Sequence, residues 1–136
     1  MLGSFLCARE AIKLMSTRHG GKGGAIVNIS SAAARLGGVG LYVDYAASKG
    51  AIDTMTFGLA REVAREGIRV NAIRPGMIET EIHADSGDPD RAWKVADTIP
   101  AGRPGTAEEI ANAVVWLLSD QASYVEGAIL DVSGGR

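Results

Sequence analysis

Tyr45 and Lys49 are the residues of this sequence whose types and spacing could do chemistry. In a helix, residues four positions apart lie one turn apart on the same face, so the phenol and the ammonium would be neighbours. At roughly 5 Å and an effective dielectric constant near 20, Coulomb's law gives about 3 kcal/mol for a phenolate beside an ammonium. The pair is therefore a candidate for proton transfer near neutral pH, although the same spacing also occurs in ordinary surface pairs.

Two short apolar stretches flank this pair, and each is expected to form a buried strand. The first covers residues 24–31 and ends in two hydroxyls, Ser30 and Ser31; the second covers residues 67–76 and ends at Pro75-Gly76. Parallel sheets bind ligands beyond the carboxyl ends of their strands. We therefore expect serine, tyrosine and lysine to converge at one edge of a sheet.

The elements that would position these residues follow from hydrophobic periodicity and from helix caps. In chain order they are a helix at about 3–18, a strand at 24–30, a loop at 32–41, a helix at 43–66, a strand at 68–73, an irregular segment at 77–100, a helix after 106 and a strand at 128–132. This order predicts an α/β fold, the second half of a doubly wound parallel sheet.

Apolar residues at helical spacing predict the buried face of each helix. They are Phe5, Ala8, Ile12 and Met15 in the first helix, Ile52, Met55, Leu59 and Val63 in the second, and Ile110, Val114, Leu117 and Leu118 in the third. Thr106 and Glu109 have the spacing of a capping box at the start of the third helix. Asn71 is a polar residue in an apolar strand, and we expect it to satisfy nearby backbone groups.

Residues 77–100 are acidic and lack a regular pattern, which indicates a mobile lid over a substrate. Asp88 and Pro89 could begin a short helix as N-cap and first residue. His83 lies among carboxylates but without compact metal-ligand spacing, so a solvated acidic lid is favoured over a metal site. Trp93 could cover the substrate or pack the lid itself.

The composition is that of an ordinary globular chain, with 136 residues, 46% hydrophobic and 22% charged. No apolar run is long enough for a membrane-spanning helix, and the start of the chain lacks the basic pattern of a secretory signal. The single cysteine, Cys7, is expected to face the core and suits a reducing cytoplasm. A net charge of −2 without a basic cluster argues against nucleic acid as a partner.

Four motifs occur together in one order and spacing: Asn28-Ile-Ser-Ser31, Tyr45-Ala-Ala-Ser-Lys49, Arg69-Val-Asn71, and Arg74-Pro-Gly76 followed by Thr80. In these motifs the chain resembles the classical short-chain dehydrogenase/reductase (SDR) family, and the similarity continues to Ser133-Gly134-Gly135. The resemblance implies a Rossmann-type fold, NAD or NADP as cofactor and a small carbonyl or alcohol substrate. It also implies a homo-oligomer, a dimer or tetramer, in the full-length form.

The resemblance also implies residue roles. Tyr45 matches the acid that protonates a carbonyl oxygen, and Lys49 matches the lysine that assists the tyrosine and binds the nicotinamide ribose. Ser31 matches the serine that polarises the carbonyl, with Ser30 as the competitor for this role. Family members place a proline-glycine turn and its followers against the nicotinamide, and the matching residues are Pro75, Gly76, Ile78 and Thr80.

A glycine-rich turn that would cradle a pyrophosphate after a strand is missing from the sequence. The cluster at residues 20–24 precedes a strand instead and is better explained as a turn. We therefore expect residues 1–136 to be a partial domain that lacks the dinucleotide-binding half and is inactive by itself. Two alternatives stay open: an extended-type epimerase or dehydratase, and a non-catalytic remnant that serves only subunit association.

Overall fold

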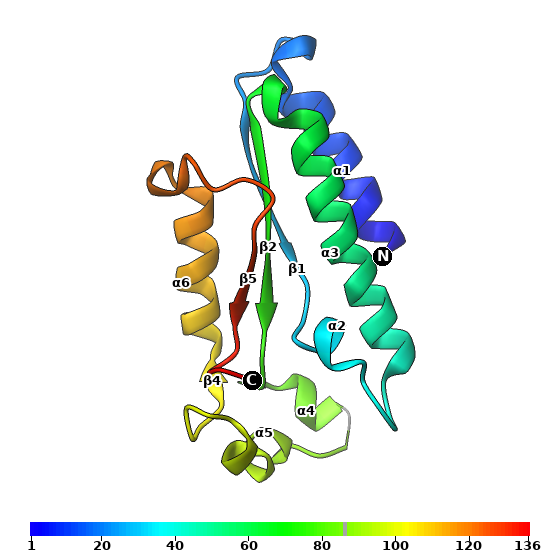
Figure 1. Cartoon of the computed structure of the whole chain (residues 1–136), viewed down its shortest axis with the longest axis vertical. Coiled ribbons are helices and arrows are strands. Elements are labelled where there is room, and N and C mark those ends of the chain that lie inside the picture. Colours follow the sequence, from blue (N-terminus) through cyan, green and yellow to red (C-terminus); the bar gives the residue numbers. More distant parts are fainter. Residues whose placement is uncertain (86) are drawn as a thin grey trace.

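A three-stranded parallel sheet forms the centre of the computed structural model, which describes residues 1–85 and 87–136. The strands are β1 (Gly24–Ile29), β2 (Ile68–Pro75) and β5 (Ile129–Val132), in the spatial order β1-β2-β5. Gly24 pairs with Ile68 at one end of the β1-β2 ladder, and Pro75 pairs with Val132 at the other end of β2. The carboxyl ends of all three strands therefore lie at the same edge (Figure 1).

Helices cover both faces of this sheet, as Figure 1 shows. The helices α1 (Leu2–Met15) and α3 (Val43–Val63) lie side by side on one face, and α6 (Ala107–Leu118) lies on the other. The chain changes faces between β2 and α6, and the segment that carries it crosses the carboxyl edge of the sheet. The α/β fold with parallel strands that the element order predicts is confirmed.

Short elements complete the chain. They are the 3-10 helices η1 (Thr17–His19), η2 (Ala64–Glu66), η3 (Ala96–Thr98) and η4 (Asp120–Ala122), the helices α2 (Ala33–Leu36), α4 (Ile82–Asp85) and α5 (Arg91–Lys94), and the paired strands β3 (Ile78–Glu79) and β4 (Gly105–Thr106). Among the described residues, no helix has both the length and the apolar character needed to cross a bilayer.

Strand β2 holds the two helical layers together because its successive side chains alternate between the faces. Ile68 and Val70 pack with Ala60 and Val63 on the α3 side. Ile73 packs on the other side against Leu117 of α6 and Ala122 of η4. Full burial of one such aliphatic side chain contributes about 1.5–3 kcal/mol, so the core depends on this strand.

Helix α6 begins with the capping box that the sequence predicts. The Thr106 hydroxyl accepts a hydrogen bond from the Glu109 N–H at 3.2 Å, and a Glu109 carboxylate oxygen accepts one from the Thr106 N–H at 2.8 Å. Leu117 is buried as expected, but the expectation for Leu118 is wrong, because this side chain is 46% exposed. One residue advances a helix by about 100°, so the two leucines face different directions.

Four further expectations need correction. The predicted loop 32–41 contains the one-turn helix α2. The short helix after Asp88 begins at Arg91 with Asp90 as its N-cap residue, because the Asp88 carboxylate pairs with Lys94 instead. In α1, Phe5 and Cys7 are exposed rather than core-facing; the core contacts of that helix come from its Ala8, Ile12 and Met15.

Candidate active site

The first turns of α3 bring Tyr45 and Lys49 together at the carboxyl edge of the sheet. The Lys49 ammonium donates a hydrogen bond to the Ile29 carbonyl at 2.8 Å and lies 5.7 Å from the centre of the Tyr45 ring. Tyr45 itself is 42% exposed. The end of β1 therefore holds the ammonium beside a phenol that solvent, and hence a ligand, can reach.

Backbone hydrogen bonds tie the two serines to the end of β2. Ser30 N–H donates to the Ile73 carbonyl at 2.8 Å, and Ala32 N–H donates to the Pro75 carbonyl at 2.9 Å. These bonds extend the parallel ladder beyond the last residue of β1 and flank Ser31 on both sides. Ser31 is thus fixed next to the proline-glycine turn.

The two serine hydroxyls have different environments. Ser30 is 2% exposed, and its hydroxyl donates to the Lys49 carbonyl at 3.2 Å. Ser31 is half-buried, and its hydroxyl oxygen accepts a hydrogen bond from Ala33 N–H at 3.1 Å. In its contact with Ala33 the Ser31 hydroxyl only accepts, so its own proton can be donated to another group. The Ser30 hydroxyl already donates its proton to a backbone carbonyl of α3.

The predicted cofactor residues follow β2. Gly76 N–H donates to the Val132 carbonyl at 3.0 Å, and a Cβ added at Gly76 would lie 2.7 Å from the Ser133 Cα. A glycine is therefore required there by close packing against the end of β5. Ile78 is half-buried in β3, where it pairs with Gly105, and Thr80 is exposed just after that strand.

A side-chain contact links α5, in the segment of residues 77–100, to the start of α3. The Arg91 guanidinium of α5 donates to the Tyr42 hydroxyl at 2.6 Å and lies 4.9 Å from the centre of that ring. The Tyr42 ring in turn packs edge-on to Tyr45, with 6.4 Å between ring centres. Trp93 donates from its indole nitrogen to Glu79 at 2.9 Å, a contact within the segment itself.

His83 belongs to the same segment. His83 Nε2 lies 2.8 Å from the Ile78 carbonyl oxygen, within hydrogen-bond distance. Over residues 1–85 and 87–136, no group of three or more His, Cys, Asp or Glu side chains is arranged to hold a metal ion.

The glycine cluster at residues 20–24 lies at the amino end of β1, opposite the candidate site (Figure 1). A Cβ at Gly21 would lie 2.3 Å from the Met15 carbonyl oxygen, and one at Gly23 would lie 2.4 Å from that of Gly67. These glycines allow close backbone packing, as expected for a turn that leads into β1.

Sequence reasoning missed a group of charged residues around the same edge. Arg74 and Asp53 form an ion pair in which both side chains are mostly buried, at 18% and 10% exposure. Two signals could have found them. An arginine at the end of an apolar strand needs a counter-charge, and Asp53 lies one helical turn beyond Lys49 on the same face.

Comparison with known proteins identifies the family. The family model described as "Enoyl-(Acyl carrier protein) reductase" matches residues 1–136. The chain belongs to the short-chain dehydrogenase/reductase family. Among curated SDR relatives, the uncharacterized oxidoreductase YgfF of Escherichia coli K12 is 62% identical over 134 residues, which cover 98% of this chain and 54% of the relative. The 3-oxoacyl-[acyl-carrier-protein] reductase FabG of the same strain is 44% identical, over 90% of this chain and 48% of FabG.

Solved structures show the same likeness to SDR proteins. The acetoin dehydrogenase YohF from Salmonella typhimurium aligns with a TM-score of 0.79 at 38% identity, over 98% of this chain and 50% of that chain. A putative 2-deoxy-d-gluconate 3-dehydrogenase from Agrobacterium tumefaciens, solved with bound NADP, aligns with a TM-score of 0.74 at 45% identity, over 83% of this chain and 46% of that chain. The chain spans about half the length of these relatives.

Proposed function

We propose that this chain carries the proton-transfer half of an NAD(P)-dependent oxidoreductase that interconverts a carbonyl and a secondary alcohol. The observation that carries the proposal is the meeting of three elements at one sheet edge. The Lys49 ammonium of α3 donates a hydrogen bond to the last carbonyl of β1, and the N–H groups of residues 30 and 32 donate to carbonyls at the end of β2. These contacts support the proposal that Ser31, Tyr45 and Lys49 act together beyond the carboxyl ends of the strands, where parallel sheets bind ligands.

Each of the three side chains has a role that its position supports. The Ser31 hydroxyl donates a hydrogen bond to the substrate oxygen and stabilises the negative charge that develops there. The Tyr45 hydroxyl then gives its proton to that oxygen during reduction and takes it back during oxidation. The Lys49 ammonium stabilises the phenolate that remains. A nicotinamide cofactor, when bound, supplies or accepts the hydride at the carbonyl carbon.

The residues present fit one end of such a cofactor. Lys49 bonds the end of β1, Pro75-Gly76 follows at the end of β2, and Ile78 and Thr80 lie in and just after β3. Tyr45 is exposed, which supports access of a ligand to this edge. The described glycine cluster lies at the wrong end of the sheet for a pyrophosphate. We therefore propose NAD or NADP as the cofactor, held at its nicotinamide end by this chain and at its phosphates by a further half-domain.

The relatives' names support a substrate class. Acetoin, a 3-oxoacyl thioester and a keto sugar acid, the chemistries that those names indicate, share a small ketone beside polar groups. We propose that residues 77–100 close over this ketone, with the Arg91–Tyr42 contact as their link to α3. One residue of this segment, number 86, lies outside the described part of the chain.

A Tyr45→Phe variant tests the proposal. The test uses a full-length form, in which this chain follows the N-terminal half of YgfF, and NADPH oxidation with the three ketone classes above. Loss of the positioned acid should lower turnover at least about a hundredfold, while NADPH affinity persists. Tyr124→Phe, at a fully exposed tyrosine after η4, is the matched control. Near-normal turnover in Tyr45→Phe would refute the proposal.

We propose further that the full-length form is a homo-oligomer in the cytoplasm. A groove between α1 and α3 is lined by the apolar Phe5, Leu6, Met55 and Leu59, with Lys13 and Glu62 among its charged neighbours. A second copy related by a two-fold axis would cover this groove and bring the opposite charges together. Phe5→Glu should therefore halve the mass seen by light scattering, while Val115→Glu, on the exposed side of α6, should leave it unchanged.

A further inference from the structure

Arg74 stands at the centre of a chain of charges beside the candidate site. Its Nε and one terminal nitrogen both lie 2.9 Å from one Asp53 carboxylate oxygen. Its other terminal nitrogen lies 3.6 Å from Asp131, the residue that pairs with Arg74 across the β2-β5 ladder. Asp131 in turn bonds Arg35 of α2. Two acids and two arginines thus alternate from α3 through the sheet to α2.

Three of these four charged residues lie on or next to an element that carries a candidate site residue. Asp53 lies one turn beyond Lys49 on α3, and Arg74 directly precedes the Pro75-Gly76 turn. Arg35 lies in the short helix that begins two residues after Ser31. The charges therefore join the three pieces of backbone that must keep a fixed relation for hydride and proton transfer.

We propose that Arg74 is a positioning residue, which fixes the Lys49 helix relative to the Pro75-Gly76 turn and so sets the nicotinamide end of the site. The inference rests on the proposed function. Arg74 does not touch the reacting atoms; it acts through the two elements on either side of it.

The hydrogen bonds of the Asp53 carboxylate show how Arg74 can hold α3 in place. One Asp53 oxygen takes both bonds from Arg74, and the other is buried without a hydrogen-bond partner among the described residues. The guanidinium is therefore the group that holds this carboxylate, and a planar fork can fix it in both distance and angle. Without the guanidinium, the Asp53 carboxylate is buried and unpaired. It can regain hydrogen bonds only from water, which requires α3 to move toward solvent.

The test compares two variants of the full-length form. Arg74→Met should raise the NADPH dissociation constant, measured by fluorescence titration, at least about tenfold, because small displacements in a positioned site have large effects. It should also lower the unfolding temperature. The double variant Asp53→Leu/Arg74→Met replaces the ion pair by packed apolar groups and should regain thermal stability, but NADPH affinity should stay low. Affinities are compared well below the unfolding temperature of each variant.

Glu66→Gln provides the matched control at the other end of the sheet. Glu66 is another mostly buried carboxylate, paired with Arg18 at 3.2 Å and bonded by Ser16. Its variant should lose thermal stability and keep NADPH affinity. If the double variant regains affinity together with stability, or if Glu66→Gln loses affinity as Arg74→Met does, Arg74 has a general stabilising role and the inference is wrong.

The Tyr45→Phe variant, measured alongside, separates the two proposals. Unchanged turnover in Tyr45→Phe refutes the proposed function. Loss of turnover there, with unchanged NADPH affinity in Arg74→Met, refutes the positioning role alone.

Discussion

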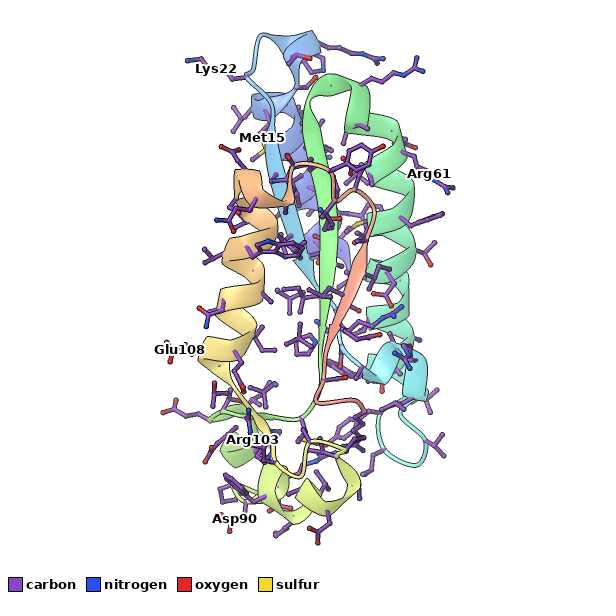
Figure 2. The ribbon with its side chains drawn as sticks, turned by 60° about the vertical axis from the view of Figure 1, so that its left-hand side comes forward. Met15, Lys22, Arg61, Asp90, Arg103 and Glu108 are labelled. Carbon is purple, nitrogen blue, oxygen red and sulfur yellow. The ribbon has the colours of Figure 1, made fainter. Side chains whose placement is uncertain are left out.

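The two ends of the same three strands are built differently. At the amino end, polar groups are closed off inside the chain: Ser16 bonds Glu66, and the Gly23 and Gly67 backbones touch with no room for a side chain. At the carboxyl end, Tyr45 and the exposed residues after β3 face outward. Figure 2 shows the separation, with Lys22 at the first end and Asp90 and Arg103 at the second.

This difference indicates that the amino ends of the strands serve stability, whereas the carboxyl ends are arranged to bind a ligand. Buried groups whose partners all lie within the chain contribute to stability and leave nothing for a ligand. The carboxyl edge instead combines fixed backbone with reachable side chains, as a preorganised site requires. Substitutions at the amino end should therefore change stability alone, whereas those around Lys49 and Arg74 should change cofactor binding or turnover.

The largest expected effect comes from testing the 136-residue chain alone. It should show no saturable binding of NADH or NADPH at micromolar concentration and no turnover, because the described residues offer no phosphate site at the carboxyl edge. The open edge of β1 and the apolar faces of α1 and α3 should also make it self-associate. Calorimetric titration and light scattering measure both. Micromolar binding by a monodisperse monomer would show that a phosphate site exists elsewhere.

Lys49→Ala is the next largest change, and it tests the carboxyl end directly. In the full-length form, turnover should fall at least about a hundredfold and cofactor affinity about tenfold, because one ammonium serves both the phenol and the ribose. Lys22→Ala, at the amino end of β1 (Figure 2), is the control and should change neither. Unaltered cofactor affinity in Lys49→Ala would count against the double role.

Much of the fold could be predicted from the sequence because local signals agreed with the tertiary structure. Thr106 and Glu109 form the capping box that their spacing indicates, and Asn71 bonds backbone groups, the Val125 carbonyl and the Ala128 N–H. The order of helices and strands was sufficient for the parallel sheet, since consecutive parallel strands need crossover helices.

Some of the errors arise where the structure depends on residues far apart in the sequence. The exposure of Phe5 and Cys7 depends on what lies against α1, which no helical spacing reveals. The candidate residues Ser31, Tyr45 and Lys49 were named from their motifs. The ion pair between Arg74 and Asp53 was missed, because these residues lie 21 positions apart and meet only after α3 packs on β2. Whether the named residues catalyse a reaction stays a prediction.

Gly23→Ala tests the amino end and should cost about 3 kcal/mol of unfolding free energy. Gly23 has a φ of +82°, and its new Cβ would lie 2.4 Å from the Gly67 carbonyl oxygen. Gly40→Ala is the matched control, with a φ of +86° and no atom within 4 Å. It should cost about 1 kcal/mol for the backbone strain alone. Urea unfolding measures both, and equal costs would show that the close contact relaxes without penalty.

The smallest expected effect concerns acid stability at the carboxyl end, where α6 begins near Arg103 and Glu108 (Figure 2). The Arg103 guanidinium, and then the Thr106 N–H, lower the pKa of Glu109 from 4.5 to about 2. A carboxyl group whose pKa is lowered by folding stabilises the folded state above its unfolded pKa, and this contribution disappears as it is protonated.

The test compares the unfolding temperatures of the wild-type chain and Glu109→Gln as a function of pH. The difference in unfolding temperature should be constant above about pH 5. It should shrink between pH 4.5 and about 2, the range over which Glu109 takes up its proton on unfolding. Glu108→Gln removes the neighbouring carboxylate, which lacks the Arg103 contact among the described residues, and is the matched control. A difference for Glu109→Gln that persists unchanged at pH 2 would show that it does not come from the charge of Glu109.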